Sequence, residues 1–128
     1  MKLRIKGNSL RLRITRPELD RLMNDGRIEE TICFAPDDRS HLSYALEHAA
    51  TASAPAVRFA PPSLEVLIPT PQAQKWSLGE DVGIYASVDL GERGSLELIV
   101  EKDFACIHGS DEENRDAFPN PDMPVPSS

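Results

Sequence analysis

The sequence carries one pattern twice, and this repetition limits the possible folds more than any other feature. Residues 2–6 and 9–15 alternate apolar and polar side chains, a period typical of strands with one buried face. A shift of 54 positions, from Leu10 to Leu64, finds the same alternation again without a gap. We therefore expect an internal duplication.

Each copy predicts the element order strand, strand, helix, strand, strand. Thr15-Arg-Pro-Glu18 has the form of a capping box, which starts a helix, and Gly26 is a natural helix end. The gap-free shift places Ile28, in the strand that follows the helix, on Val82. Further strands are expected over 27–35 and 42–46.

Units 1–54 and 55–108 together supply eight strands and two short helices. Neither unit alone offers enough apolar surface for a stable core, so we expect a single domain over 1–108. The predicted fold is mainly β (α+β), with duplicated ββαββ units forming one pseudo-twofold, eight-stranded antiparallel barrel or sandwich. A closed sheet would leave no exposed strand edges. Residues 109–128, rich in acidic side chains and proline, are predicted to form a tail.

Basic residues are concentrated at the start of the chain. The first 21 residues carry seven Lys or Arg residues against two acidic ones, although the whole chain has a net charge of −7. The outward side chains of the first two strands form the predicted site for an anion, a nucleic acid or the chain's own tail: Arg4, Lys6, Arg11 and Arg13. A negative chain repels nucleic acid at long range, so nucleic acid is the less favoured partner. The alternative is a solvated face neutralised by acidic residues of the second unit or the tail.

Phe118 is an aromatic residue among the acidic residues and prolines of the tail. It is the predicted anchor of this segment, either in a basic groove of a partner protein or over the chain's own basic hairpin. A free, solubilising tail is the third possibility.

Three side chains that can bind metal ions follow the last predicted strand: Asp103, Cys106 and His108. A zinc site needs four ligands, or three and a water molecule. The sequence offers no second Cys-x-x-Cys or His-x-x-x-His pair to complete it. A buried cysteine beside a surface histidine explains the pattern more simply, so we predict no metal and no cofactor.

One predicted turn contains the residue types of a hydrolase triad: Asp37, Asp38, Ser40 and His41. Neighbours in one turn cannot take the geometry that Ser–His–Asp chemistry requires. The sequence also has no glycine-rich phosphate loop, His-Glu-x-x-His motif or nucleophile elbow. The prediction is a protein that is not an enzyme.

The expected cellular compartment follows from the N-terminal residues, the apolar segments and the cysteines. Charges at Lys2, Arg4 and Lys6 occupy the place where a secretory signal peptide requires an apolar stretch. No segment approaches the roughly 18 apolar residues of a membrane helix. Cys33 and Cys106 do not make the disulfide framework typical of small secreted proteins. We therefore expect a cytoplasmic protein without a membrane partner.

A second local pattern is Lys6-Gly-Asn-Ser9, followed by Leu10-Arg-Leu-Arg-Ile14 and a helix that starts at proline. This stretch, residues 6–22, resembles the opening of AbrB/MazE-type swapped-hairpin domains, which are transcription factors and antitoxins. The resemblance implies that two such units form one barrel and that basic residues around the strand pair touch DNA. At the matching positions these residues would be Lys6, Arg11 and Arg13, with Arg4 nearby. The second unit departs from the pattern with Pro61-Pro62, Glu65 and Leu67.

The chain starts with KLRIKGNSLRLRIT after its first residue and carries EKDFACIH and DAFPNP near its end. Both ends resemble a family of uncharacterised bacterial proteins of about 120 residues. This resemblance spans the chain but implies no activity. The predicted function is a non-enzymatic binding or regulatory protein that uses the basic hairpin and the acidic C-terminal tail. The alternatives are an AbrB/MazE-like DNA-binding regulator or antitoxin, and a small metal-binding protein or enzyme.

Overall fold

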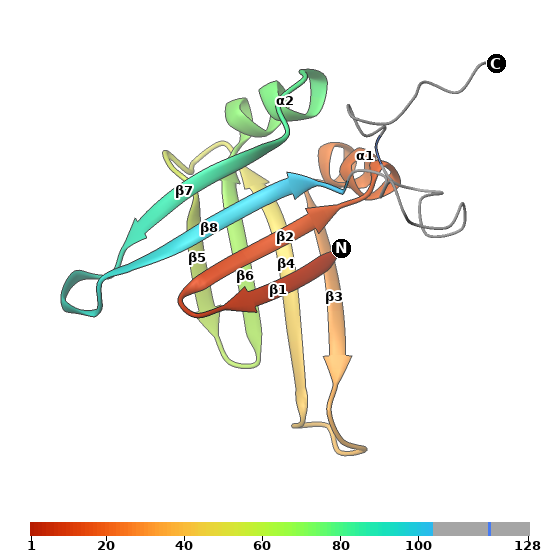
Figure 1. The fold of residues 1–128 in the computed structure, drawn as a ribbon. Helices are drawn as coiled ribbons and strands as arrows, with labels where there is room; N and C mark the ends of the chain where they lie inside the picture. Colours follow the sequence, from red (N-terminus) through yellow and green to blue (C-terminus); the bar gives the residue numbers. More distant parts are fainter. Residues whose placement is uncertain (104–117, 119–128) are drawn as a thin grey trace, which may run out of the picture.

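The computed structural model describes residues 1–103 and residue 118, which form eight strands in two sheets and two helices (Figure 1). The elements follow one another as β1 (Lys2–Lys6), β2 (Ser9–Ile14), α1 (Arg16–Asp25), β3 (Arg27–Cys33), β4 (His41–Ala49), β5 (Ala56–Ala60), β6 (Ser63–Pro69), α2 (Thr70–Leu78), β7 (Gly83–Asp89), the short 3₁₀ turn η1 (Gly91–Arg93) and β8 (Ser95–Lys102). The predicted mainly β class is confirmed.

Each sheet takes one hairpin from each half of the chain. The first sheet has the strand order β1-β2-β8-β7, and the second has the order β3-β4-β6-β5. The hairpins are antiparallel, but the central pairs, β2 with β8 and β4 with β6, are parallel. The predicted antiparallel pairing is therefore wrong at both central pairs, because the strands joined there are separated by long connections that allow either direction. The two sheets are not closed into a barrel.

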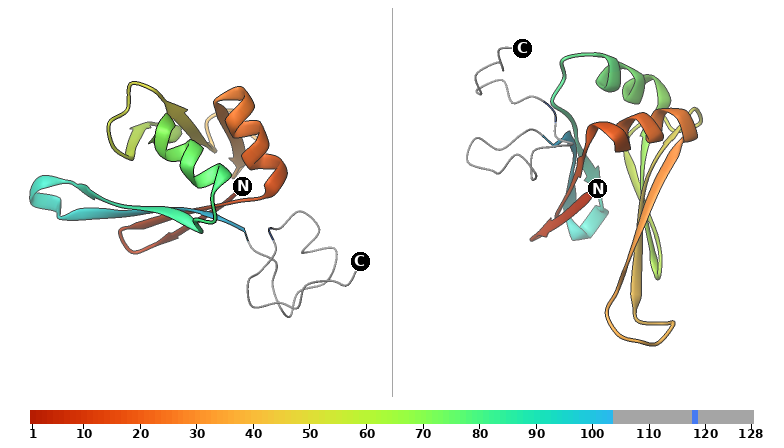
Figure 2. Two further views of the ribbon diagram at one scale, coloured as in Figure 1. Left: turned by 90° about the horizontal axis from the view of Figure 1, so that it is seen from above. Right: turned by 90° about the vertical axis from the view of Figure 1, so that its right-hand side faces the viewer.

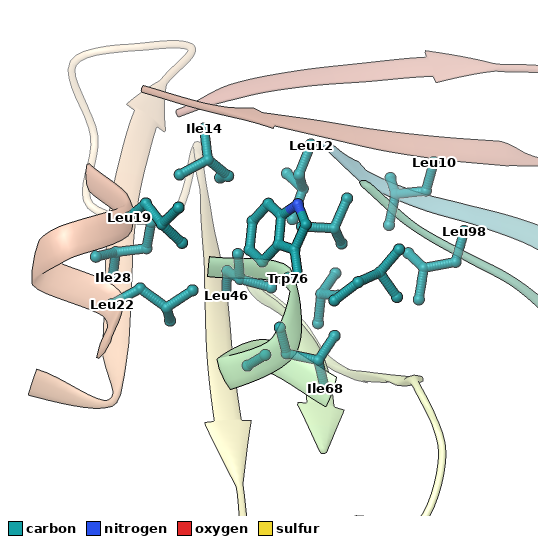
Figure 3. Close-up of a cluster of buried hydrophobic side chains, with 14 residues drawn as sticks. Leu10, Leu12, Ile14, Leu19, Leu22, Ile28, Leu46, Ile68, Trp76 and Leu98 are labelled. Carbon is teal, nitrogen blue, oxygen red and sulfur yellow. The ribbon is translucent and has the colours of Figure 1, made fainter. Parts of the chain in front are cut away.

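Both helices cover the same end of the two sheets, as the side views show (Figure 2). In Figure 1 the strands of the first sheet cross in front of those of the second. One apolar cluster joins both sheets and both helices, with Trp76 of α2 pointing among Leu12 and Leu46 from the facing sheets (Figure 3). The largest side chains with less than 2% exposure are Leu12, Ile14, Leu22, Leu46, Val66, Ile68, Trp76, Leu98 and Val100.

The ends of α1 follow the local chemistry of the sequence. The Thr15 hydroxyl accepts a hydrogen bond from the Glu18 N–H, and the Glu18 carboxylate accepts one from the Thr15 N–H at 3.0 Å. This confirms the predicted capping box. Gly26 ends the helix with φ at 85°, a left-handed conformation that favours glycine. By contrast, α2 has no side-chain cap, and burial of Ala73 and Trp76 holds it in place.

The two halves share the same strand register, with one exception. Leu10 pairs with Leu98 in the first sheet, and Leu64 pairs with Tyr44 in the second, which is the same pairing after the 54-residue shift. In β7, however, Ile84 takes the place that Ile28 has in β3, because Ile28 pairs with Leu46 and Ile84 with Val100. The gap-free match of Ile28 to Val82 is therefore wrong by two residues. Two extra residues between α2 and β7 account for the shift.

Within residues 1–103 and at residue 118, no helix is both long enough and apolar enough to cross a membrane. The predicted tail, residues 109–128, lies outside the described residues apart from Phe118.

Candidate anion-binding face of the first sheet

The basic residues predicted from the sequence lie together on the outward face of the first sheet. Cross-strand pairing places Arg4 directly opposite Arg11, and Lys6 opposite Ser9. Because successive side chains of a strand point to opposite faces, these residues point away from the apolar core. We call Arg4, Lys6, Arg11 and Arg13 the basic face.

Acidic residues of β8 and its end neutralise one part of the basic face. Arg13 Nε lies 2.9 Å from Glu101 Oε1, and Arg11 Nε lies 3.6 Å from the same oxygen. Beside the basic face, Lys2 Nζ lies 3.1 Å from Asp103 Oδ2. The second unit therefore supplies countercharges to the first, as the alternative interpretation of the sequence expected.

Arg4 and Lys6 differ from the other members of the basic face. Both are exposed, and within the described part of the chain neither forms an ion pair. Together with Ser9 and Arg11 they line an open hollow of about 150 Å³. Like charges directly opposite each other, such as Arg4 and Arg11, destabilise a strand pair. An anion in the hollow would relieve this repulsion.

The second sheet has the same register but neutralises its own charges. Arg58 takes the place of Arg4, and Glu65 takes the place of Arg11, so that the pair Arg58–Glu65 is an ion pair of 3.1 Å. Glu65 also binds Arg27, which in turn lies 2.9 Å from Glu29. Hydrogen bonds from Arg58 and Arg27 lower the pKa of Glu65 to about 2. Among the described residues, an arginine without an ion pair, Arg4, therefore distinguishes the strands of the first sheet from those of the second.

The low pKa of Glu65 predicts acid sensitivity. A carboxyl group with a lower pKa in the folded state stabilises that state above its ordinary pKa, and the stabilisation is lost as protonation proceeds. The Glu65 contribution is thus present above pH 4.5 and disappears as the pH falls to about 2. We expect Glu65→Gln to lower the urea midpoint at pH 7, and this difference from the wild type to shrink on acidification.

Glu80→Gln is the control, because Glu80 is exposed and has no ion pair among residues 1–103 and 118. It should leave the midpoint unchanged at both pH values. A Glu65→Gln difference that stays constant or grows at low pH would contradict the assignment.

A second group of charges lies beside the start of α1. Glu18 is buried, binds the Met1 ammonium group and shares that ammonium with Glu30, whose Oε1 lies 3.2 Å from it. Tyr44 donates a hydrogen bond of 2.9 Å to Glu30. Burial alone would raise the pKa of Glu18, but hydrogen bonds from the ammonium group and from Thr15 outweigh it and lower the pKa. Glu18 and Glu30 thus both have partners within the chain. The sequence predicted Glu18 as part of the capping box but gave no sign that it also binds the Met1 ammonium group.

The predicted metal candidates are only partly described. Asp103 uses its carboxylate for Lys2, and its carbonyl accepts the Phe118 N–H at 2.8 Å. Cys106 and His108 lie outside the described residues. Elsewhere in the described chain, no three His, Cys, Asp or Glu side chains are grouped so that they could hold a metal ion. The metal hypothesis remains a prediction.

The turn with hydrolase-type residues is held by its own hydrogen bonds. The Ser40 hydroxyl donates to Asp37 at 2.8 Å, and the backbone N–H of Arg39 donates to the same carboxylate. These bonds lower the pKa of Asp37. His41 Nδ1 lies 2.9 Å from the carbonyl oxygen of Asp38. The Asp37 carboxylate therefore binds the turn itself.

Phe118 lies beside the end of β8, where its N–H bonds to the carbonyl oxygen of Asp103. Its ring packs against the apolar cluster, and Lys102 Nζ lies 5.5 Å from the ring centroid. Lys102 is buried and also donates to the carbonyl oxygen of Gly79 at 3.0 Å. The role of Phe118 as a tail anchor stays a prediction, because the neighbouring tail residues lie outside the described part.

Two apolar residues beside the basic face were missed from the sequence. Arg11 pairs with Ile99, and Ile99 pairs with Tyr85, so both share the outward face with the arginines. Tyr85 is 61% exposed. Its outward orientation could have been predicted from the alternation with Ile84, which is buried. Its position beside Arg11 could not, because the parallel pairing of β2 with β8 has no local signal.

Comparison with known proteins yields one match. The sequence model of a family of unknown function matches residues 1–122. No curated protein matches the chain, and no solved structure matches it. The family match therefore assigns no activity to the chain.

Proposed function

Since the chain belongs to DUF7009, a family of unknown function, we propose its role from the geometry of the basic face. The protein is a non-enzymatic binding protein that holds the anionic groups of a polyanionic partner on the outward face of its first sheet. The observation that carries this proposal is that Arg4 and Lys6, which form no ion pair with any described residue, lie beside Arg11 around a hollow of about 150 Å³.

Charge and register support the proposal. At the equivalent place of the second sheet, Arg58 is matched by Glu65, so an anion would gain little there. Binding at Arg4 and Arg11 would instead remove a repulsion between like charges. Charge-assisted hydrogen bonds of arginine to phosphate or carboxylate are about twice as strong as neutral ones. The affinity should fall as the salt concentration rises, because the arginine and lysine side chains displace counterions from the polyanion when they bind it.

Inorganic polyphosphate is a suitable test compound, because it offers anionic groups and nothing else. We expect binding at low salt, measured by isothermal titration calorimetry, and a loss of about tenfold or more with Arg4→Glu, which replaces an attractive charge by a repulsive one. Arg39→Glu is the matched control. It changes the net charge equally, but Arg39 is exposed on the loop between β3 and β4. Equal losses in both variants, or no binding by the wild type, would contradict the proposal.

The proposal extends to the origin of the two sheets. Their shared register supports a duplication of one ββαββ unit, after which only the first unit kept or gained the basic face on its β1–β2 hairpin. Arg11 and its counterpart Glu65 mark this difference. Alignment of the two units across members of the family checks the idea, since unrelated units would not align better with each other than with shuffled sequences.

Contact with duplex DNA, which the AbrB/MazE resemblance implies, is the second candidate. Lys6, Arg11 and Arg13 are the positions it requires, and they share one face. Arg13, however, is paired with Glu101 at 2.9 Å, which reduces the charge available for a DNA backbone. A labelled duplex, tested beside a single strand and inorganic polyphosphate, separates the two candidates.

A further inference from the structure

One row of four side chains crosses the outward face of the first sheet. Register places them side by side on β1, β2, β8 and β7 in this order: Arg4, Arg11, Ile99 and Tyr85. Neighbouring strands lie about 4.8 Å apart, so the backbones at Arg11 and Tyr85, two strands apart, are separated by about 10 Å. The row thus presents cationic groups at one end and an exposed aromatic ring at the other.

The aromatic end of the row is suited to stacking. Tyr85 is 61% exposed, and partly buried Ile99 beside it extends the apolar surface towards Arg11. An exposed ring beside cations on a sheet is the arrangement that proteins use to bind a base together with its backbone phosphates. The span between the cations and the ring suits a phosphate and the base of a neighbouring nucleotide.

The second sheet provides an internal comparison for this row. The equivalent positions, in the same order, hold Arg58, Glu65, Ala45 and Glu29. Here the aromatic ring is replaced by a carboxylate, the isoleucine by alanine and one arginine by glutamate. The same backbone arrangement therefore keeps one arginine, whose charge is paired with Glu65, and lacks the second arginine and the aromatic ring.

Acidic side chains beside the row favour single-stranded over duplex nucleic acid. Glu101 and Glu97 lie in the rows on either side of Ile99, and Glu97 accepts a hydrogen bond of 3.0 Å from Ser87. These carboxylates would repel the closely spaced phosphates of a duplex laid across the sheet. A base can stack on Tyr85 only if its face is free, which base pairing and stacking in a duplex prevent.

We propose that this row binds single-stranded nucleic acid, with a backbone phosphate held by Arg4 and Arg11 and a base stacked on Tyr85. This inference rests on the proposed function and names its partner. The phosphate contacts supply affinity without sequence preference, and stacking on a tyrosine ring accepts any base. Binding should therefore depend on salt and on the absence of a second strand, and only weakly on sequence.

The test uses fluorescence anisotropy with a labelled oligothymidylate, the same oligonucleotide in a duplex, and competition by inorganic polyphosphate. The wild type should bind the single strand more tightly than the duplex. Tyr85→Ala should weaken single-strand binding by about five- to a hundredfold, the range found when a stacking ring is removed. Tyr85→Phe should retain binding, because it keeps the ring.

Phe59→Ala is the matched control, because Phe59 is also 61% exposed but belongs to the second sheet. It should leave oligothymidylate binding unchanged. The polyphosphate affinity should survive Tyr85→Ala and fall with Arg4→Glu, which separates stacking from phosphate contact.

The outcomes distinguish this inference from the proposed function. If Tyr85→Ala leaves oligothymidylate binding unchanged while Arg4→Glu abolishes polyphosphate binding, the stacking site is overturned and the anion-binding face stands. If the duplex binds more tightly than the single strand, the inference is overturned in favour of duplex DNA. If no polyanion binds the wild type, both proposals fail. A melting curve of each variant shows whether it is folded.

Discussion

Replacing Trp76 by alanine should lower the free energy of unfolding by about 3–5 kcal/mol, the range for removal of a buried tryptophan. The ring is 1% exposed and lies at the centre of the apolar cluster between the two sheets (Figure 3). Its Nε1 donates a hydrogen bond of 3.3 Å to the carbonyl oxygen of Val82, which would lose this donor. Since α2 has no side-chain cap, its place on the core depends largely on the burial of Trp76 and Ala73. Domains of ordinary stability have about 5–15 kcal/mol in total, so the loss is a large part of it.

Urea unfolding followed by far-ultraviolet circular dichroism measures this change. Fluorescence is unsuitable for the comparison, because Trp76 is the single tryptophan of the chain. Trp76→Phe is the control and should lose less, since it keeps an aromatic ring in the core although it removes the N–H. A loss below about 1 kcal/mol in Trp76→Ala would mean that the ring does not join the two sheets.

A second large effect is expected at Leu12, and the sheet itself supplies its control. Leu12 is 1% exposed on the inner face of β2, so Leu12→Ala should lower the free energy of unfolding by about 2–5 kcal/mol through lost burial and a residual cavity. Leu67 lies on the outer face of β6, opposite Glu47, and is only partly buried. Leu67→Ala removes the same atoms and should lose about 1 kcal/mol or less, because water already reaches the site.

The comparison tests which face of each sheet is buried. Both variants can be measured by urea unfolding followed by the fluorescence of Trp76. Equal losses would show that the outward face of the second sheet is covered. That result would conflict with the exposure of Arg58, which lies on the same face opposite Glu65.

Local features of the fold could be predicted from the sequence. Alternation at 9–15 predicted β2 and its buried Leu10, Leu12 and Ile14, and Thr15 with Glu18 predicted the start of α1. These signals act over a few residues, so the surrounding chain hardly changes them.

The pairing between hairpins could not be predicted in this way. A strand with one apolar face can pair in either direction, and nothing near Leu10 indicates Leu98 as its neighbour. The two-residue shift of β7 was also hidden, because a shift of two keeps the same side chains facing inward.

The same limit applied to the candidate site. The sequence identified Arg4, Lys6 and Arg11, since they alternate with apolar residues in one hairpin. Glu101 and Tyr85 reach this face only through β8, whose position depends on the whole fold. The sequence could suggest countercharges from the second unit, but Glu101 as their source and Tyr85 as the candidate stacking ring emerged only from the three-dimensional arrangement.

Because each sheet combines hairpins from both halves of the chain, the two sheets can form at different times during synthesis. In the second sheet Tyr44 pairs with Leu64, 20 positions later, so this sheet can close as soon as β6 has left the ribosome. In the first sheet Leu10 pairs with Leu98, 88 positions later. Pairs so distant in sequence form slowly, because a long loop must close first. The row from Arg4 to Tyr85 thus forms only after the chain has been translated through β8. Shorter nascent chains carry Arg4 and Arg11 without Ile99 and Tyr85 beside them.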